Sequence, residues 1–297
     1  MKFGKIDNLS EINFSLPKDD LQTKLILGKA FGNNFNVSVG CAKWNRNDLK
    51  GFYPRGTKDE LIYYSHRFNS IELNATFYNM PSVAQIVKWR EKTPENFQFF
   101  PKITQSISHF RRLLNVDELT NTFCDAVANF EEKLGMVFLQ LHDNFSPNEF
   151  GKLKEFIIRF PKVIPLAVEV RNRKWYSDKT IWDTYCTLLE NNRVANLIVD
   201  TAGRRDMLHQ RLTTPTAFIR FVGCNDNTID FKRLDEWILR IKQWKNEGLE
   251  NLYFFVHQNF EESSPMFTAH FIQKLNETLG LELRIPTLAD GYIESKK

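Results

Sequence analysis

From residue 37 onward, short β-branched or aromatic runs alternate with segments whose apolar residues recur at helical spacing. The runs predict strands at residues 37–41, 69–74, 97–102, 136–142, 164–170, 194–200, 216–222 and 251–257. The segments between and after them predict helices at 58–67, 82–92, 117–133, 147–159, 178–191, 230–247 and 262–279. This alternation is typical of parallel βαβ units. Eight such units predict an α/β fold, a (β/α)₈ barrel of the TIM type.

Residues 1–36 differ from the rest, because they are polar and are punctuated by Pro17 and Gly32. We expect them to form an N-terminal extension, with one short helix at most, packed on a single barrel domain of residues 37–297. An open doubly wound sheet is the alternative, but no glycine-rich phosphate loop follows the first predicted strand.

Most of the predicted strands place apolar residues at one parity and polar residues at the other. Barrel strands point alternate side chains toward the helices and toward the axis. If the apolar parity faces the helices, the polar side chains point to the axis near the carboxyl ends of the strands. In the sixth strand this rule turns Leu197 and Val199 outward. The inward set is then Glu72, Asn74, Lys102, Gln140, His142, Glu169, Arg171, Asp200, Arg220 and His257.

A balanced set of carboxylates and cations suits acid–base chemistry on a polar, anionic or sugar-containing small molecule, by hydrolysis, elimination or isomerisation. Glu72 and Glu169 lie on different strands and have unlike neighbours, so they are the first candidates for proton transfer. Asp200 and His257 complete the predicted catalytic set. Buried charges must be paired. An ion-pair network that only fills the barrel is therefore the structural alternative.

Substrate contacts are predicted from two kinds of residue. Cationic side chains can bind a carboxylate or phosphate, and arginine does so with two hydrogen bonds. Aromatic side chains that follow a strand can stack on a ring at the mouth. The predicted ligands are Trp44, Asn74, Tyr78, Lys102, Gln140, His142, Arg171, Trp175, Arg204 and Arg220. The polar segment 42–57 is expected to form a lid.

Charge and cysteine spacing limit the partners. The net charge of +4, from 40 basic and 36 acidic residues, is too small to indicate nucleic acid. A small-molecule substrate is therefore expected, and a non-catalytic module for nucleic acid or a phosphate ligand is the alternative. The four cysteines show no metal-binding spacing. No metal site is assigned and the cofactor is unknown, although a divalent metal on histidines and carboxylates of several strands is a further alternative.

The chain contains no apolar run of about 18 residues and no apolar leader after Met1. We therefore expect a cytoplasmic protein without a membrane partner. The oligomeric state is open.

Several segments carry a family likeness: 40–44, 68–78, 134–141, 168–175 and 218–220. They resemble the YecE-like family (domain of unknown function 72), over roughly residues 37 to 280. The Glu72-Leu-Asn74-Ala-Thr-Phe-Tyr78 piece is the most specific. The resemblance implies a barrel without an established activity. His142 stands where the family usually has proline and Val222 where it usually has histidine, which implies a rearranged site.

Overall fold

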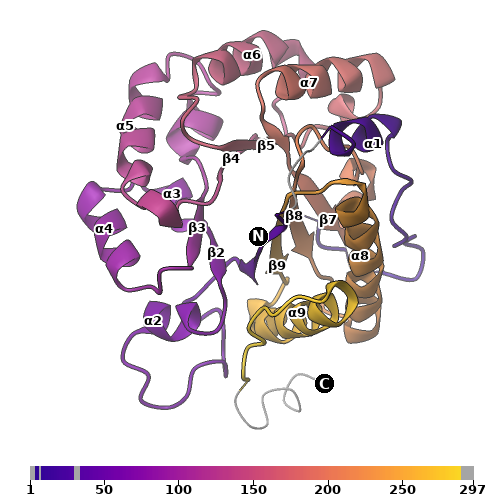
Figure 1. Cartoon of the computed structure of the whole chain (residues 1–297). Coiled ribbons are helices and arrows are strands. Elements are labelled where there is room, and N and C mark those ends of the chain that lie inside the picture. Colours follow the sequence, from indigo (N-terminus) through magenta and orange to yellow (C-terminus); the bar gives the residue numbers. More distant parts are fainter. Residues whose placement is uncertain (1–3, 7, 30–33, 289–297) are drawn as a thin grey trace.

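The computed structural model describes residues 4–6, 8–29 and 34–288. Its strands lie in the middle and its helices surround them (Figure 1). The strands are β1 (Asn36–Cys41), β2 (Ser70–Leu73), β3 (Gln98–Pro101), β4 (Val137–Gln140), β5 (Leu166–Glu169), β6 (Ala195–Asn196), β7 (Ile198–Thr201), β8 (Thr216–Val222) and β9 (Asn251–His257). Every predicted strand is present. The sixth is interrupted at Leu197 and so contributes both β6 and β7.

The α-helices are α1 (Leu21–Leu27), α2 (Glu60–Ser65), α3 (Ala75–Tyr78), α4 (Val83–Glu91), α5 (Asp117–Ala128), α6 (Phe150–Arg159), α7 (Lys179–Asn191), α8 (Asn227–Glu247) and α9 (Ser264–Leu279). Side chains of Asp59, Ser82, Asp178 and Asp226 cap four of them by accepting from first-turn backbone amides. The predicted helices coincide with α2 and with α4 to α9, whereas α3 is too short for periodicity to indicate. No helix in the described part of the chain combines the length and apolarity needed to cross a bilayer.

All strand pairs are parallel, which confirms an α/β fold built on parallel sheets. The order in the sheets is β1-β9-β8-β7, β2-β3 and β4-β5-β6. β3 and β4 meet only through isolated bridges, one of them between Lys102 and Phe138. Hydrogen-bonded ladders therefore do not close into one ring among the described residues.

Side chains replace the ladder between β1 and β2. The Asn69 side chain donates to the Val37 carbonyl at 2.7 Å and accepts from the Val39 amide at 2.9 Å. Gly40 allows the close approach of the two strands, because a Cβ there would lie 2.1 Å from the Ser70 carbonyl oxygen. The two strands thus stay adjacent without backbone pairing.

Apolar side chains form two buried clusters. The larger lies between strands and helices, and the smaller is built from the opposite parity of the same strands. In the smaller cluster the Phe100 ring lies 4.7 Å from Tyr253 and 4.8 Å from Phe255, between ring centres. Polar residues nearer the carboxyl ends of these strands therefore lie next to a layer of buried aromatic rings.

The parity rule is wrong in the sixth strand. Leu197 and Val199 belong to the inner cluster, so Asp200 points outward to α8. Its carboxylate accepts from Trp237 Nε1 and from Arg233 Nη2, each at 2.8 Å. The helix that covers this strand carries polar partners. The outward side of the strand is polar for that reason.

The N-terminal segment contacts α8 and the carboxyl end of β7. Asp19 pairs with Arg240 on α8, and the Gly203 amide donates to the Gly4 carbonyl at 2.8 Å. Helix α1 also packs on α8 (Figure 1). Of the predicted extension, residues 1–3, 7 and 30–33 lie outside the described residues, as do 289–297 of the predicted barrel domain.

Substituting Gly203 by alanine is expected to displace the start of the chain from β7. A Cβ on Gly203 would lie 2.7 Å from the Gly4 carbonyl oxygen, and backbone atoms there cannot give way cheaply. Amide hydrogen exchange of residues 4–15 should rise several-fold in the variant. Gly151→Ala is the control, because a Cβ there meets nothing within 4 Å. Equal exchange in both variants would show that the contact holds nothing in place.

Candidate functional site

Arg220 on β8 forms the centre of a buried charged cluster. Its Nε and Nη2 donate to the two carboxylate oxygens of Glu72 at 2.8 Å each, and its Nη1 donates to Glu169 Oε2 at 2.8 Å. Glu72 ends near the carboxyl edge of β2 and Glu169 ends β5, so one guanidinium joins two distant strands. Fork-shaped pairing of this kind is the strongest form of charged hydrogen bond.

Both carboxylates are ionised at neutral pH. Burial raises the pKa of Glu72, but Arg220 and His257 outweigh it and hold that pKa well below its usual range. Burial acts on Glu169 in the same way, and Arg171 and Arg220 together lower its pKa. Neither group is therefore a proton donor at pH 7, and a proton must come from elsewhere in the cluster.

His257, at the end of β9, is the group placed to give or take that proton. Its Nε2 lies 2.9 Å from Glu72 Oε2, and its Nδ1 lies 3.6 Å from Glu261 Oε1. Burial and the nearby Arg220 lower the pKa of His257, but the Glu72 and Glu261 carboxylates together outweigh them, so the pKa is raised. The protonated ring donates from Nε2 to Glu72, whereas Arg220 Nη2, 3.3 Å from the same Nε2, can donate to the neutral ring.

A second arm of the cluster extends from β3 to β5. Lys102 Nζ donates to Gln140 Oε1 at 2.9 Å and lies 4.0 Å from the centre of the Phe77 ring. Arg171 Nε donates to Glu169 Oε1. Burial, with the cations Arg220 and Arg171, lowers the pKa of Lys102 to about 7. The arm thus carries one permanent cation and one amine that is half neutral at physiological pH.

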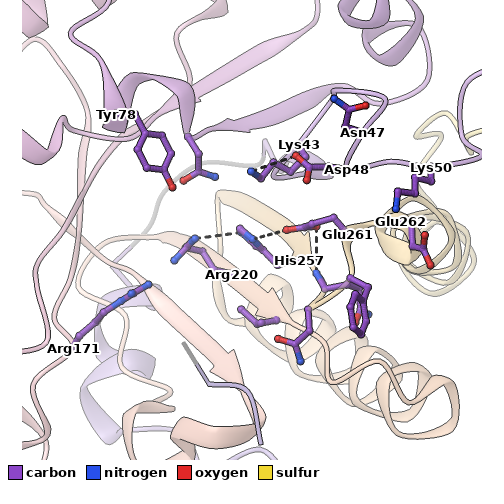
Figure 2. Close-up of a pocket in the computed structure, with 15 residues that line it drawn as sticks. Lys43, Asn47, Asp48, Lys50, Tyr78, Arg171, Arg220, His257, Glu261 and Glu262 are labelled. Carbon is purple, nitrogen blue, oxygen red and sulfur yellow. Dashed lines mark hydrogen bonds and ion pairs between the residues drawn. The ribbon is translucent and has the colours of Figure 1, made fainter. Parts of the chain in front are cut away.

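A cavity of about 470 Å³ opens over the cluster. Figure 2 shows Arg171 and Arg220 at one end of it, His257 beside Glu261 in the middle, and Lys50 and Glu262 at the other end. Lys43, Asn74 and Tyr78 also line it. Glu72 and Glu169 do not line the cavity, whereas Arg171 and Arg220, which they hold, do.

Most of the predicted site residues do come together. Glu72, Asn74, Lys102, Gln140, Glu169, Arg171, Arg220 and His257 form the cluster. Tyr78, with a side chain 55% exposed, lines the cavity from α3. Arg204 lies at the margin, where its Nη2 donates to the Arg171 carbonyl at 2.8 Å. His142 is exposed, and its ring lies 5.2 Å from that of His109.

Asp200, Trp44 and Trp175 point away from the charged cluster, and their predicted placement in it is wrong. Asp200 points to α8, as described above. Trp44 packs edge-on against Trp89 of α4, with ring centres 5.7 Å apart. Trp175 is fully buried and donates from Nε1 to the Phe145 carbonyl at 2.9 Å. Packing a large indole against a helix or loop removes more apolar surface from water than placing it at the solvent-filled opening of the cavity, and is therefore more favourable.

Glu261 is the functional candidate that sequence reasoning missed. It follows β9 in the loop before α9, and besides facing His257 it accepts from the Ser264 hydroxyl at 2.7 Å. Its position just after a strand is the one signal that could have identified it. From the predicted lid 42–57, Lys43, Asn47, Asp48 and Lys50 line the cavity.

The described residues hold no group of three or more histidines, cysteines or carboxylates arranged to bind a metal ion. Arg220 stands between Glu72 and Glu169, where a cation would otherwise sit. We assign no cofactor to the cluster.

Comparison with known proteins places this chain in a family. The family described as "Protein of unknown function DUF72" matches residues 38–289. The UPF0759 protein YecE of Escherichia coli K12 is 27% identical over 264 residues, covering 82% of this chain and 94% of its own. The UPF0759 protein YunF of Bacillus subtilis is 31% identical over 155 residues, covering 48% and 52%.

Solved structures agree on the fold. A DUF72 family protein from Thermotoga maritima superposes with a TM-score of 0.63 at 25% identity, covering 81% of this chain and 99% of its own. One from Enterococcus faecalis has a TM-score of 0.66 at 18% identity, covering 84% and 100%. With the sequence match, this shows that the chain belongs to the DUF72 family, a family described as being of unknown function.

Proposed function

We propose that this protein is an enzyme that transfers a proton to or from a polar small molecule carrying an anionic group. The observation that carries the proposal is the position of His257 on the cavity wall, between Glu72 and Glu261. A histidine held between two carboxylates and open to a cavity has the geometry of a general acid–base group. Hydrolysis, elimination and isomerisation all use such a group.

Charge on the cavity wall supports an anionic substrate. Arg171 and Arg220 line it, and a protonated His257 adds a third cation. The two buried carboxylates beneath compensate the two arginines, and Glu261 faces His257 and compensates its protonated ring. An anion bound on the arginines would add negative charge near His257 and favour its protonated form, so binding should be coupled to proton uptake.

The paired network also fits a purely structural role, which is the competing interpretation. A plug of ion pairs needs no opening to solvent, whereas Arg171, Arg220 and His257 all line a cavity. We infer from this opening that the network serves a site. In our proposal Glu72 and Glu169 position the cations, and His257 exchanges the proton.

The surface around the opening of the cavity gives less support to the alternative of nucleic-acid binding. Its cations are largely paired: Lys43 with Asp48, Arg112 with Glu149, and Arg204 with Asp206. Binding to nucleic-acid phosphates needs cations that are free to displace the counterions of the nucleic acid. We keep nucleic acid as the second candidate, to be tested by the salt dependence of binding.

We further propose that the strands form one (β/α)₈ barrel of residues 37–297, with residues 1–36 as an extension packed on it. Support comes from the links that cross each gap between sheets: Asn69 between β1 and β2, the bridges between β3 and β4, and the strand shared by β6 and β7. The four cysteines are unpaired thiols, which supports a reducing compartment such as the cytoplasm.

Replacing His257 by asparagine tests the function. Titration calorimetry with inorganic phosphate should show one site in the wild type, tighter at pH 6 than at pH 8, and binding about tenfold weaker in the variant. Proton NMR of sugar phosphates and hydroxy acids incubated with the protein should show conversion that falls at least a hundredfold in the variant. His270→Asn is the control, because His270 pairs with Asp235 on the surface, outside the cavity. Phosphate binding that is absent, or equal in all three proteins, would contradict the proposal.

A further inference from the structure

We propose that the Lys102 amine is a nucleophile that forms an imine with a carbonyl group of the substrate. The substrate class is then a carbonyl compound with an anionic group, such as a 2-oxo acid or a phosphorylated aldose or ketose. The inference rests on the proposed function, because it places the carbonyl compound in the same cavity and its anionic group on the same cations.

Lys102 differs from the buried arginines around it. Arg171, Arg220 and Arg233 each form an ion pair with a buried carboxylate. Lys102, with a side chain only 1% exposed, makes no ion pair with a carboxylate of the described residues. Its contacts are Gln140 Oε1, at 2.9 Å, and the face of the Phe77 ring. A buried ammonium would leave donors unused there.

These surroundings favour the neutral amine. An ammonium group has three N–H donors, whereas Lys102 meets one oxygen acceptor and one aromatic face. Burial and the positive charges of Arg220 and Arg171 act against the charged form, which lowers the pKa of Lys102 to about 7. Lysines in such surroundings are the ones that act as nucleophiles, because the free lone pair is available at neutral pH.

Lys102 does not itself line the cavity, but its amine is held by few contacts and lies close to residues that do. Leaving its place costs Lys102 one hydrogen bond and one ring contact, whereas Arg220 would lose three hydrogen bonds to carboxylates. Arg171, whose charge acts on Lys102, lines the cavity. Tyr78, next in sequence to Phe77, lines it too. In the proposal the flexible four-carbon stem of Lys102 turns from its buried position toward the cavity, where the amine meets the carbonyl group.

The reaction balances without another reactant. The nitrogen lone pair attacks the carbonyl carbon, a C–N bond forms, and the carbonyl oxygen takes up a proton to give a carbinolamine. The nitrogen lone pair then forms the C=N bond as the C–O bond breaks, and the oxygen leaves as water with the two hydrogens that began on the amine. The imine nitrogen takes up one further proton from solvent, and the protonated imine draws electrons from the adjacent carbon. Proton removal at that carbon, or cleavage of a bond to it, becomes easier, and His257 can exchange the proton.

Reductive trapping tests the inference on the full chain. The protein is incubated at pH 7 with pyruvate and sodium cyanoborohydride, which reduces an imine to a stable secondary amine, and peptides are mapped by mass spectrometry. Lys102 should be modified at least tenfold faster than exposed Lys50, with a rate that is half-maximal near pH 7. An ordinary lysine has a pKa of about 10.4 and is almost entirely protonated there.

The Lys102→Met variant is the control, because it keeps a stem of similar length, removes the nucleophile and brings no charge into surroundings that favour a neutral group. Its modification should be confined to slow labelling of surface lysines, with a melting temperature near that of the wild type. Wild-type protein that binds phosphate but leaves Lys102 unlabelled would overturn the imine while the proposed function stands. Protein that does neither would overturn both.

Discussion

Replacing Arg220 by methionine is expected to lower the free energy of unfolding by about 3–5 kcal/mol at pH 7. The substitution leaves Glu72 and Glu169 buried without the guanidinium that holds both of them. Urea denaturation of the variant and the wild type measures the difference. Lys179→Met is the control, because it breaks an exposed pair with Asp183 and should leave the free energy of unfolding nearly unchanged.

The loss in the Arg220 variant should shrink as the pH falls. In the wild type the pKa of Glu72 is lowered, so its stabilisation is complete above the unfolded value of about 4.5 and is lost as pH falls through the folded value. In the variant, burial without Arg220 raises the pKa of Glu72. The buried carboxylate therefore becomes protonated at pH values above 4.5, and the cost of burying its charge disappears there. A deficit below 1 kcal/mol, or one that is larger at pH 5 than at pH 7, would contradict this account of the cluster.

Replacing Asp200 by asparagine should lower the free energy of unfolding by about 3 kcal/mol and leave the cavity unchanged. Asp200 is fully buried and binds Arg205, Arg233 and the Trp237 indole on the outward side of β7. Phosphate binding, measured by calorimetry below the melting temperature, should match the wild type. The parity rule, which placed Asp200 on the inward side of this strand, predicts the opposite result, namely lost function with intact stability.

Asp235→Asn is the matched control for that substitution, since Asp235 is on α8 but exposed, where it pairs with His270. Its effect on unfolding should stay within about 0.5 kcal/mol. Weakened phosphate binding in Asp200→Asn would mean that this carboxylate acts on the cavity after all.

The parity of polar residues predicts the site well wherever the covering helix is apolar. It brings Glu72, Lys102, Glu169 and Arg220 together correctly, because Ile71, Ile219 and similar neighbours have only apolar surface to meet on the other side. At β7 the rule is wrong, since α8 presents arginine and tryptophan to the strand. The partner of a strand face lies far away in sequence, and parity within one strand carries no information about it.

Loop residues were predicted less well for a related reason. Trp44 and Trp175 follow strands as binding aromatics do, but the half-buried Trp44 packs against Trp89 and the buried Trp175 bonds to the loop at Phe145. Glu261 faces His257 only because the chain turns back after β9. Such positions depend on loop conformation, which alternation of polarity does not encode. Family resemblance predicts the parallel α/β fold and its extent, whereas the chemistry of the cluster depends on distances between strands.

The charge state of His257 tests the central claim most directly. Histidine-selective labelling and NMR titration of the full chain would follow its ring, with His257→Asn to assign the signal. The account predicts a pKa for His257 above 6.5, because the Glu72 and Glu261 carboxylates together outweigh burial, and a further rise when inorganic phosphate is added. A pKa below 6.5, or one that phosphate leaves unchanged, would contradict a proton-transfer site for anionic substrates in this cavity.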